Sequence, residues 1–166
     1  MHYRNGKANK NITIRGNKIM IDTIKQKMKY IEEITRQLGY ELSKDDYFIE
    51  DMGCPHTQPK KMPDGYAAIY IFVYKNEFIK IGKANAKSNA RFVSQHYGFS
   101  APSTLAKSIC SDEKFTSIGV SQENVKSWMM ENLHRINIYV KSNKATTELV
   151  EAVLHYAFRP RFEGNI

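Results

Sequence analysis

The chain has 166 residues, with 25 Lys and Arg against 17 Asp and Glu, which gives a formal net charge of +8. A hydrophobic content of 42% excludes a fully disordered chain. No apolar run reaches the roughly 18 residues of a membrane span. The polar N-terminus does not resemble a signal peptide, so we expect a soluble, basic protein. Its two cysteines, Cys54 and Cys110, form no disulfide framework and indicate free thiols in the reducing cytoplasm.

Two basic stretches without acidic residues indicate an anionic partner. Residues 1–18 are expected to form either a flexible arm that follows phosphates or an ordinary unstructured terminus. The second stretch, Phe78 to Ser111, mixes Lys and Arg with aromatic residues. This mixture is typical of a groove that contacts a nucleic-acid backbone, because cations balance phosphate charge while rings stack on bases.

The first part of the chain predicts one helix followed by a loop. Apolar residues at steps of three and four predict an amphipathic helix from Asp22 to Leu38, with Asp22 as N-cap and Gly39 as the stop. Residues 40–64 lose this periodicity and gather Asp, Pro and Gly, which predicts a loop or linker. We therefore expect three segments: a basic flexible arm (1–18), a helix with its linker (19–64) and a folded domain (65–166).

The folded domain is predicted to open with a β-hairpin. Its strands are expected at 66–74 and 78–81, with a polar turn between them and Gly82 at the end. Helical segments follow at 88–97, 101–109 and 121–133, then a short strand at 137–140 and a helix at 146–158 that Pro160 ends. This order indicates an α+β fold, with a small three-stranded antiparallel sheet flanked by helices and an N-terminal helical extension.

Several residues of this domain resemble the GIY-YIG nuclease domain. Ala68-Ile69-Tyr70 lies on the first predicted strand, Lys80-Ile81-Gly82 closes the second, and Arg91 lies in the next helix. Glu151 and Asn165 follow in the chain order of the family's metal-binding glutamate and late asparagine. The resemblance covers about the last hundred residues, and it depends on the combination of motifs, because each motif alone occurs by chance.

The resemblance implies an endonuclease that hydrolyses DNA phosphodiester bonds with one Mg²⁺ or Mn²⁺ ion. The reaction accumulates negative charge on phosphate oxygens, which the permanently charged Arg91 can bind two at a time. Glu151 is the implied metal ligand, since a single carboxylate with several waters suits Mg²⁺. Tyr70 would act on the attacking water as base or orienting group, and we expect nearby cations to favour its phenolate.

Lys80 departs from the family pattern, because a tyrosine usually stands at this position; some restriction endonucleases of the family also carry lysine there. Crowding by Lys83 and Arg91 is expected to lower the pKa of Lys80. Lys80 could then act as the base in its neutral form, or hold the water while Tyr70 takes the proton.

A second departure follows the arginine, where Gln95 stands at the position that is often His or Tyr in the family. His96 is expected to fill that role, with Tyr97 as the weaker candidate. Further nucleic-acid contacts are expected from Lys83, Lys87, Tyr97, Lys107 and Asn165.

Ordinary structural roles stand beside these interpretations. Tyr70 could be a sheet aromatic, Arg91 a surface residue and Glu151 half of an ion pair. His155 shares a helix face with Glu151 and is expected at most to support it, while the Cys54–His56 segment lacks a second ligand pair for zinc. The alternative function is a module that binds nucleic acid without cleaving it. A third interpretation makes residues 78–111 an RNA-contacting surface, although we expect DNA rather than RNA.

Overall fold

The computed structural model describes residues 5–141 and 143–162, with side chains from residue 18 onward. Its elements follow in the order α1 (Asn5–Gln37), β1 (Tyr47–Gly53), β2 (Tyr66–Tyr74), β3 (Glu77–Ala84), α2 (Asn89–Val93), the 3₁₀ helix η1 (Gln95–Tyr97), α3 (Leu105–Cys110), α4 (Glu113–Thr116), α5 (Val125–Asn132), β4 (His134–Lys141) and α6 (Lys144–Phe158). Contacts divide the chain into two units, Met1–Glu41 and Leu42–Ile166. Among the helices described, none has the length and apolar character needed to cross a bilayer.

The first unit contains the single long helix α1. This helix begins at Asn5, so it includes most of the stretch expected to be a flexible arm; residues 1–4 lie outside the described part. Asp22, expected as the N-cap, lies inside the helix, because no breaking residue directly precedes it. The predicted stop is confirmed: Gly39 has φ +82°, and its N–H donates to the Arg36 carbonyl.

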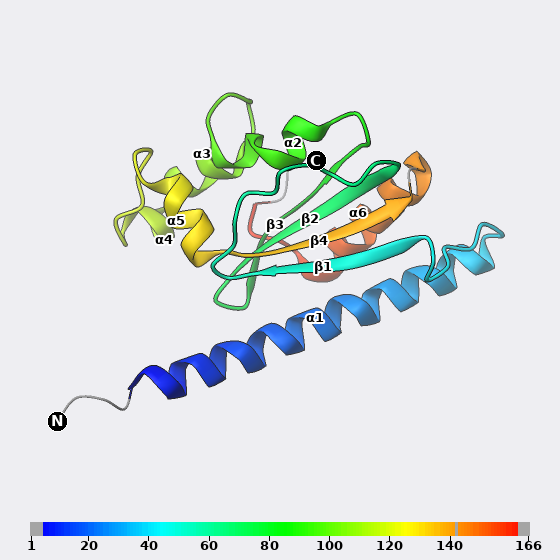
Figure 1. Ribbon diagram of the computed structural model, residues 1–166, viewed down its shortest axis with the longest axis horizontal. Helices are drawn as coiled ribbons and strands as arrows, with labels where there is room; N and C mark the ends of the chain where they lie inside the picture. Colours follow the sequence, from blue (N-terminus) through cyan, green and yellow to red (C-terminus); the bar gives the residue numbers. More distant parts are fainter. Residues whose placement is uncertain (1–4, 142, 163–166) are drawn as a thin grey trace. The chain divides into compact units, whose positions relative to one another are not determined.

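The second unit contains a four-stranded antiparallel sheet in the order β1-β4-β2-β3 (Figure 1). Its α+β class and the three strands β2, β3 and β4 were predicted from the sequence. The expectation of only three strands is wrong, because β1 lies in the segment expected to be a loop. Its sequence contains two acids and ends in Gly, so its pairing with β4 decides its structure rather than local propensity. The unit accordingly begins at Leu42 and not at residue 65.

The predicted helices after the hairpin occur in the structure, but several of their boundaries differ from the prediction. The predicted segment 88–97 divides into α2 and η1, and α3 begins later than expected because Thr104 caps it, accepting from the Lys107 N–H. Pro102 is therefore outside the helix. The short α4 was not predicted. The helix α6 begins at Lys144, earlier than the predicted residue 146, because Asn143 caps it and accepts from the Thr146 N–H; it ends before Pro160, as predicted.

The main hydrophobic core lies on one face of the sheet. Alternate residues of β2 supply its floor, and side chains from α2, η1, α3, α4 and α5 cover it: Ala68, Tyr70, Phe72, Tyr74, Phe92, Tyr97, Leu105, Ile109, Phe115 and Met129. The helix α6 contacts β2 and β3 outside this cluster. As a result, β2 and β3 carry side chains toward both helical layers.

A short segment after α6 follows the outer side of β3. The Arg161 N–H donates to the Phe78 carbonyl and the Phe162 N–H to the Ile79 carbonyl, each at 2.9 Å. The Arg161 guanidinium also contacts the carboxylate of Asp112, at 2.7 and 3.0 Å. These bonds fix the end of the described chain beside the strand that carries Lys80 and Gly82.

Candidate active site

Tyr70, Gly82 and Arg91 meet at one point of the sheet. The β2–β3 register places Tyr70 opposite Gly82, on a strand pair formed by the predicted hairpin. A Cβ atom on Gly82 would lie 2.3 Å from the Tyr70 hydroxyl oxygen, so only glycine leaves room for the phenol. Arg91, carried by α2, donates its Nε–H to the same hydroxyl at 3.4 Å. The three elements that bear the resemblance motifs therefore converge on one hydroxyl group.

Glu151 interacts electrostatically with Tyr70, and Lys80 interacts with Arg91 and Glu151. Lys80 is partly buried on β3, and Glu151 lies on α6; the Glu151 carboxylate acts on the titration of Tyr70, Lys80 and Arg91. Burial, followed by repulsion from Arg91, lowers the pKa of Lys80. The expected direction is therefore confirmed, but its main cause is burial. Lys83, expected to add to the repulsion, instead donates to the Glu151 carboxylate at 2.6 Å.

The expected ease of ionising Tyr70 is wrong. The side chain is completely buried, and this burial raises the pKa of its phenol. The hydrogen bond and charge of Arg91 act in the opposite direction but do not overcome burial. Tyr70 is therefore a neutral phenol at ordinary pH, able to donate or accept a hydrogen bond.

His96 lies against Tyr70 but is buried. Its ring centroid is 4.2 Å from that of Tyr70, and only 3% of the residue is exposed. Burial lowers its pKa to about 3, and the charges of Arg135, Arg91 and Lys80 act in the same direction. Neither ring nitrogen has a partner among the described residues. The imidazole is thus neutral and faces Tyr70 rather than solvent.

The residue that sequence reasoning missed is Arg135 on β4. Its fully buried guanidinium donates to the Tyr97 hydroxyl and the Phe92 carbonyl, both at 2.8 Å. The hydroxyl of Tyr97 is also 2.8 Å from His56 Nε2. The available signal was the alternation of β4, in which polar Arg135 and Asn137 alternate with isoleucines; only residues 137–140 were recognised as strand.

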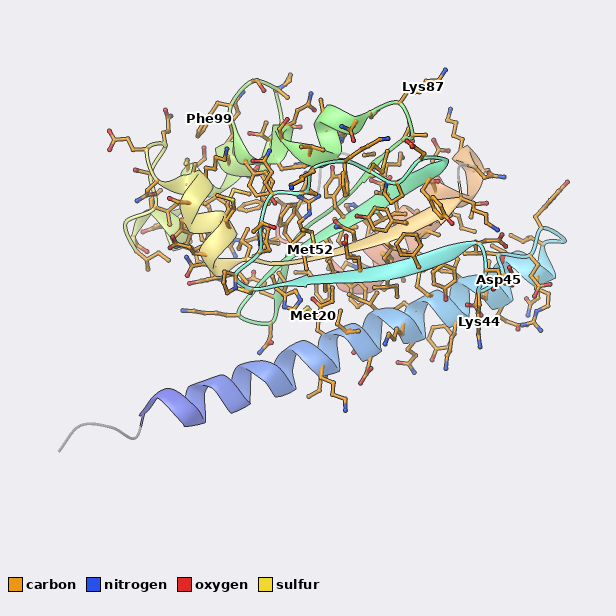
Figure 2. All side chains as sticks on the ribbon, in the orientation of Figure 1. Met20, Lys44, Asp45, Met52, Lys87 and Phe99 are labelled. Carbon is orange, nitrogen blue, oxygen red and sulfur yellow. The ribbon has the colours of Figure 1, made fainter. Side chains whose placement is uncertain are left out.

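The expected nucleic-acid contacts have different environments. Lys87 is exposed and extends away from the ribbon after β3 (Figure 2), whereas Lys83 is paired with Glu151 and Lys107 donates to the Ala101 carbonyl at 2.7 Å. Tyr97 is a correction: it is 3% exposed and bonded inside the domain, so it is not available to a ligand. The last expected contact, Asn165, lies outside the described residues.

Glu151 is the one candidate metal ligand that the sequence singled out in this region, and it carries the hard oxygen donors that Mg²⁺ prefers. No group of three His, Cys, Asp or Glu side chains suitable for a metal occurs in the part of the chain that the structure describes. His155 Nε2 is 2.8 Å from the Ile81 carbonyl and thereby supports β3 rather than a metal. A divalent ion here would depend on one carboxylate.

No protein-family model, curated protein or solved structure matches this chain.

Proposed function

We propose that the second unit contains a GIY-YIG-type nuclease site, which hydrolyses DNA phosphodiester bonds with the help of one divalent cation. The observation that carries this proposal is the convergence of Tyr70, Gly82 and Arg91 on one hydroxyl group. These residues come from the motifs on which the resemblance rests. The antiparallel sheet of the α+β fold is compatible with that family.

Arg91 is the proposed phosphate-binding residue. It is exposed, and its contact with Tyr70 raises the pKa of the guanidinium, so it is cationic at any working pH. A planar guanidinium can hold two phosphate oxygens and stabilise the charge that accumulates on them in the transition state. Its Nε–H is engaged by Tyr70, which leaves the two terminal nitrogens for phosphate.

Lys80, rather than Tyr70, is the proposed base for the attacking water. The lowered pKa of Lys80 increases the fraction of neutral amine, which can accept a proton. The raised pKa of Tyr70 keeps its hydroxyl protonated, so Tyr70 orients its neighbours through hydrogen bonds. His96 is neutral but too buried to reach the solvent, and it supports the Tyr70 ring.

Glu151 fits the role of metal ligand, because it is a carboxylate and because its side chain is accessible to an ion from solvent. Its side chain is 20% exposed, and a single carboxylate completed by waters is an ordinary arrangement for Mg²⁺ or Mn²⁺. Such an ion, when bound, supplies positive charge for the oxygen that leaves the phosphate. Lys83 donates to one oxygen of the same carboxylate, so an ion bound at that oxygen would displace the ammonium.

The Lys83–Glu151 ion pair also favours a second candidate function, a nucleic-acid-binding module that does not cleave. In that case Lys83 is the permanent partner of Glu151, and the complete burial of Tyr70 is a structural feature. The charge of Arg91 and Lys87 would still attract phosphates.

One assay distinguishes the nuclease from the module that binds nucleic acid without cleaving it. Supercoiled plasmid is incubated with the protein and Mg²⁺ or Mn²⁺, using wild type, Arg91→Ala and Glu151→Ala. We expect metal-dependent nicking by wild type only, since each substitution removes a group that acts in the transition state. Glu148→Ala, an exposed acid on the same helix, is the matched control and is expected to cut normally.

Binding is measured separately by fluorescence anisotropy with labelled duplex DNA in EDTA. Wild type that binds DNA but produces no nicks with either metal would contradict the nuclease proposal and support the binding module. Competition by single-stranded RNA tests whether the surface prefers RNA.

A further inference from the structure

Arg135 is a buried cation held only by neutral groups. Its Nε–H donates to the Asn137 side-chain oxygen at 3.1 Å, and its two terminal nitrogens donate to Tyr97 and Phe92. The rings of Phe72, Phe92 and Tyr97 surround the guanidinium carbon at 5.2, 4.8 and 5.8 Å. Within the described residues, no carboxylate forms an ion pair with it. Each of its three nitrogens nevertheless donates one hydrogen bond to these partners.

Packing alone does not account for this arrangement. A buried charge without a counter-ion carries a large desolvation cost, which an apolar side chain of similar volume would avoid. The guanidinium differs from an apolar side chain in offering rigid, diverging donors that can hold two separate acceptors. The acceptors outside β4, Tyr97 and Phe92, therefore indicate the structural role of Arg135.

Two of the acceptors, Phe92 and Tyr97, lie in the segment from α2 to η1. Phe92 directly follows Arg91 in the chain, and Tyr97 directly follows His96. One side chain on β4 thus holds this segment at two points. Directly before each attachment in the chain, the segment carries a group that contacts Tyr70: the Arg91 Nε–H precedes Phe92, and the His96 ring precedes Tyr97.

We propose that Arg135 is a positioning residue, whose guanidinium fixes the α2–η1 segment so that Arg91 and His96 face Tyr70. This inference rests on the proposed nuclease function for its catalytic consequence, but its structural core is independent of nucleic acid. Arg135 touches neither the exposed phosphate-binding atoms nor Glu151, so it acts through the segment.

Two substitutions of Arg135 separate the effect of its charge from the effect of its hydrogen bonds to Phe92 and Tyr97. His96 is faced by Arg135 from β4, Arg91 from α2, Lys80 from β3 and the neutral Tyr70 from β2. Arg135→Lys keeps the positive charge but cannot hold both acceptors, whereas Arg135→Met removes both properties. Arg161→Lys is the matched control, because the Arg161 guanidinium also forms several hydrogen bonds, but to Asp112 and not to the α2–η1 segment.

The test follows the Tyr70–His96 ring contact by NMR, together with the His96 titration and single-turnover cleavage of DNA. In Arg135→Lys we expect weaker ring-to-ring cross-peaks and a cleavage rate about 10- to 100-fold lower. The titration midpoint of His96 should stay near its low wild-type value, since the charge is retained. In Arg135→Met it should rise. Arg161→Lys should change none of these readouts.

A folded Arg135→Lys protein that keeps the wild-type ring contact and rate would overturn the inference. If Arg135→Lys does not fold, Tyr97→Phe removes one acceptor and is judged by the same ring contact, whose retention would equally refute the positioning role. If the wild-type protein never cuts DNA, the nuclease proposal fails. Loss of the ring contact in Arg135→Lys would still support the positioning role in that case.

Discussion

Replacing Lys83 by methionine should strengthen binding of a divalent cation at Glu151. The ammonium lies 2.6 Å from the carboxylate, and the two side chains are 29% and 20% exposed. An ion pair of this partly solvated kind contributes about 1 kcal/mol. A divalent cation at this carboxylate must displace the ammonium. Removing the ion pair should therefore increase the affinity of Glu151 for the cation about fivefold.

A titration with Mn²⁺, in which electron paramagnetic resonance detects the free ion, measures this affinity. The measurement does not depend on nuclease activity. Lys87→Met is the matched control, because it removes an equal charge from an exposed position nearby. Equal affinities in Lys83→Met and Lys87→Met would show that general charge, and not displacement at Glu151, controls metal binding. Weaker binding in Lys83→Met would refute the competition outright.

Two further changes test the buried parts of the site. Gly82→Ala should destabilise the protein by about 1–3 kcal/mol in urea unfolding, because the new methyl group overlaps the buried Tyr70 hydroxyl; Gly98→Ala, with open space at its Cβ position, should have little effect. Burial lowers the pKa of His56 to about 4 and that of His96 to about 3, while the unfolded chain takes up these protons near pH 6.5. Stability should therefore fall between pH 7 and pH 5, by about 2 kcal/mol for each histidine; His96→Phe should remove its share, and an unchanged pH dependence in that variant would refute this assignment.

The β2–β3 hairpin could be predicted because its information is local. Strands of Ile, Val and aromatic residues flank a short polar turn. The pairing of Tyr70 with Gly82 was seen only in the structure. The strand β1 could not be predicted in the same way, because it contains two acids and depends on pairing with β4, some 85 residues later. Local patterns thus identified the strands β2, β3 and β4 but not the edge strand β1.

The protonation states could not be predicted, because they depend on burial. From the sequence, cations near Tyr70 favour a phenolate, but the fold removes the phenol from water and reverses the direction. His96 was expected to act at the site; it does lie beside Tyr70, but it is buried. Arg135 was missed because its partners lie about 40 positions earlier in the chain.

The hydrogen bonds from Arg161 and Phe162 to β3 have a consequence for handling the protein. An uncovered edge strand offers its backbone groups to other chains, and such pairing leads to aggregation. These two residues occupy the carbonyls of Phe78 and Ile79 on the outer side of that edge. A variant ending at Phe158 would leave them open, so shortening the protein at this point would cost solubility even if the site itself were intact.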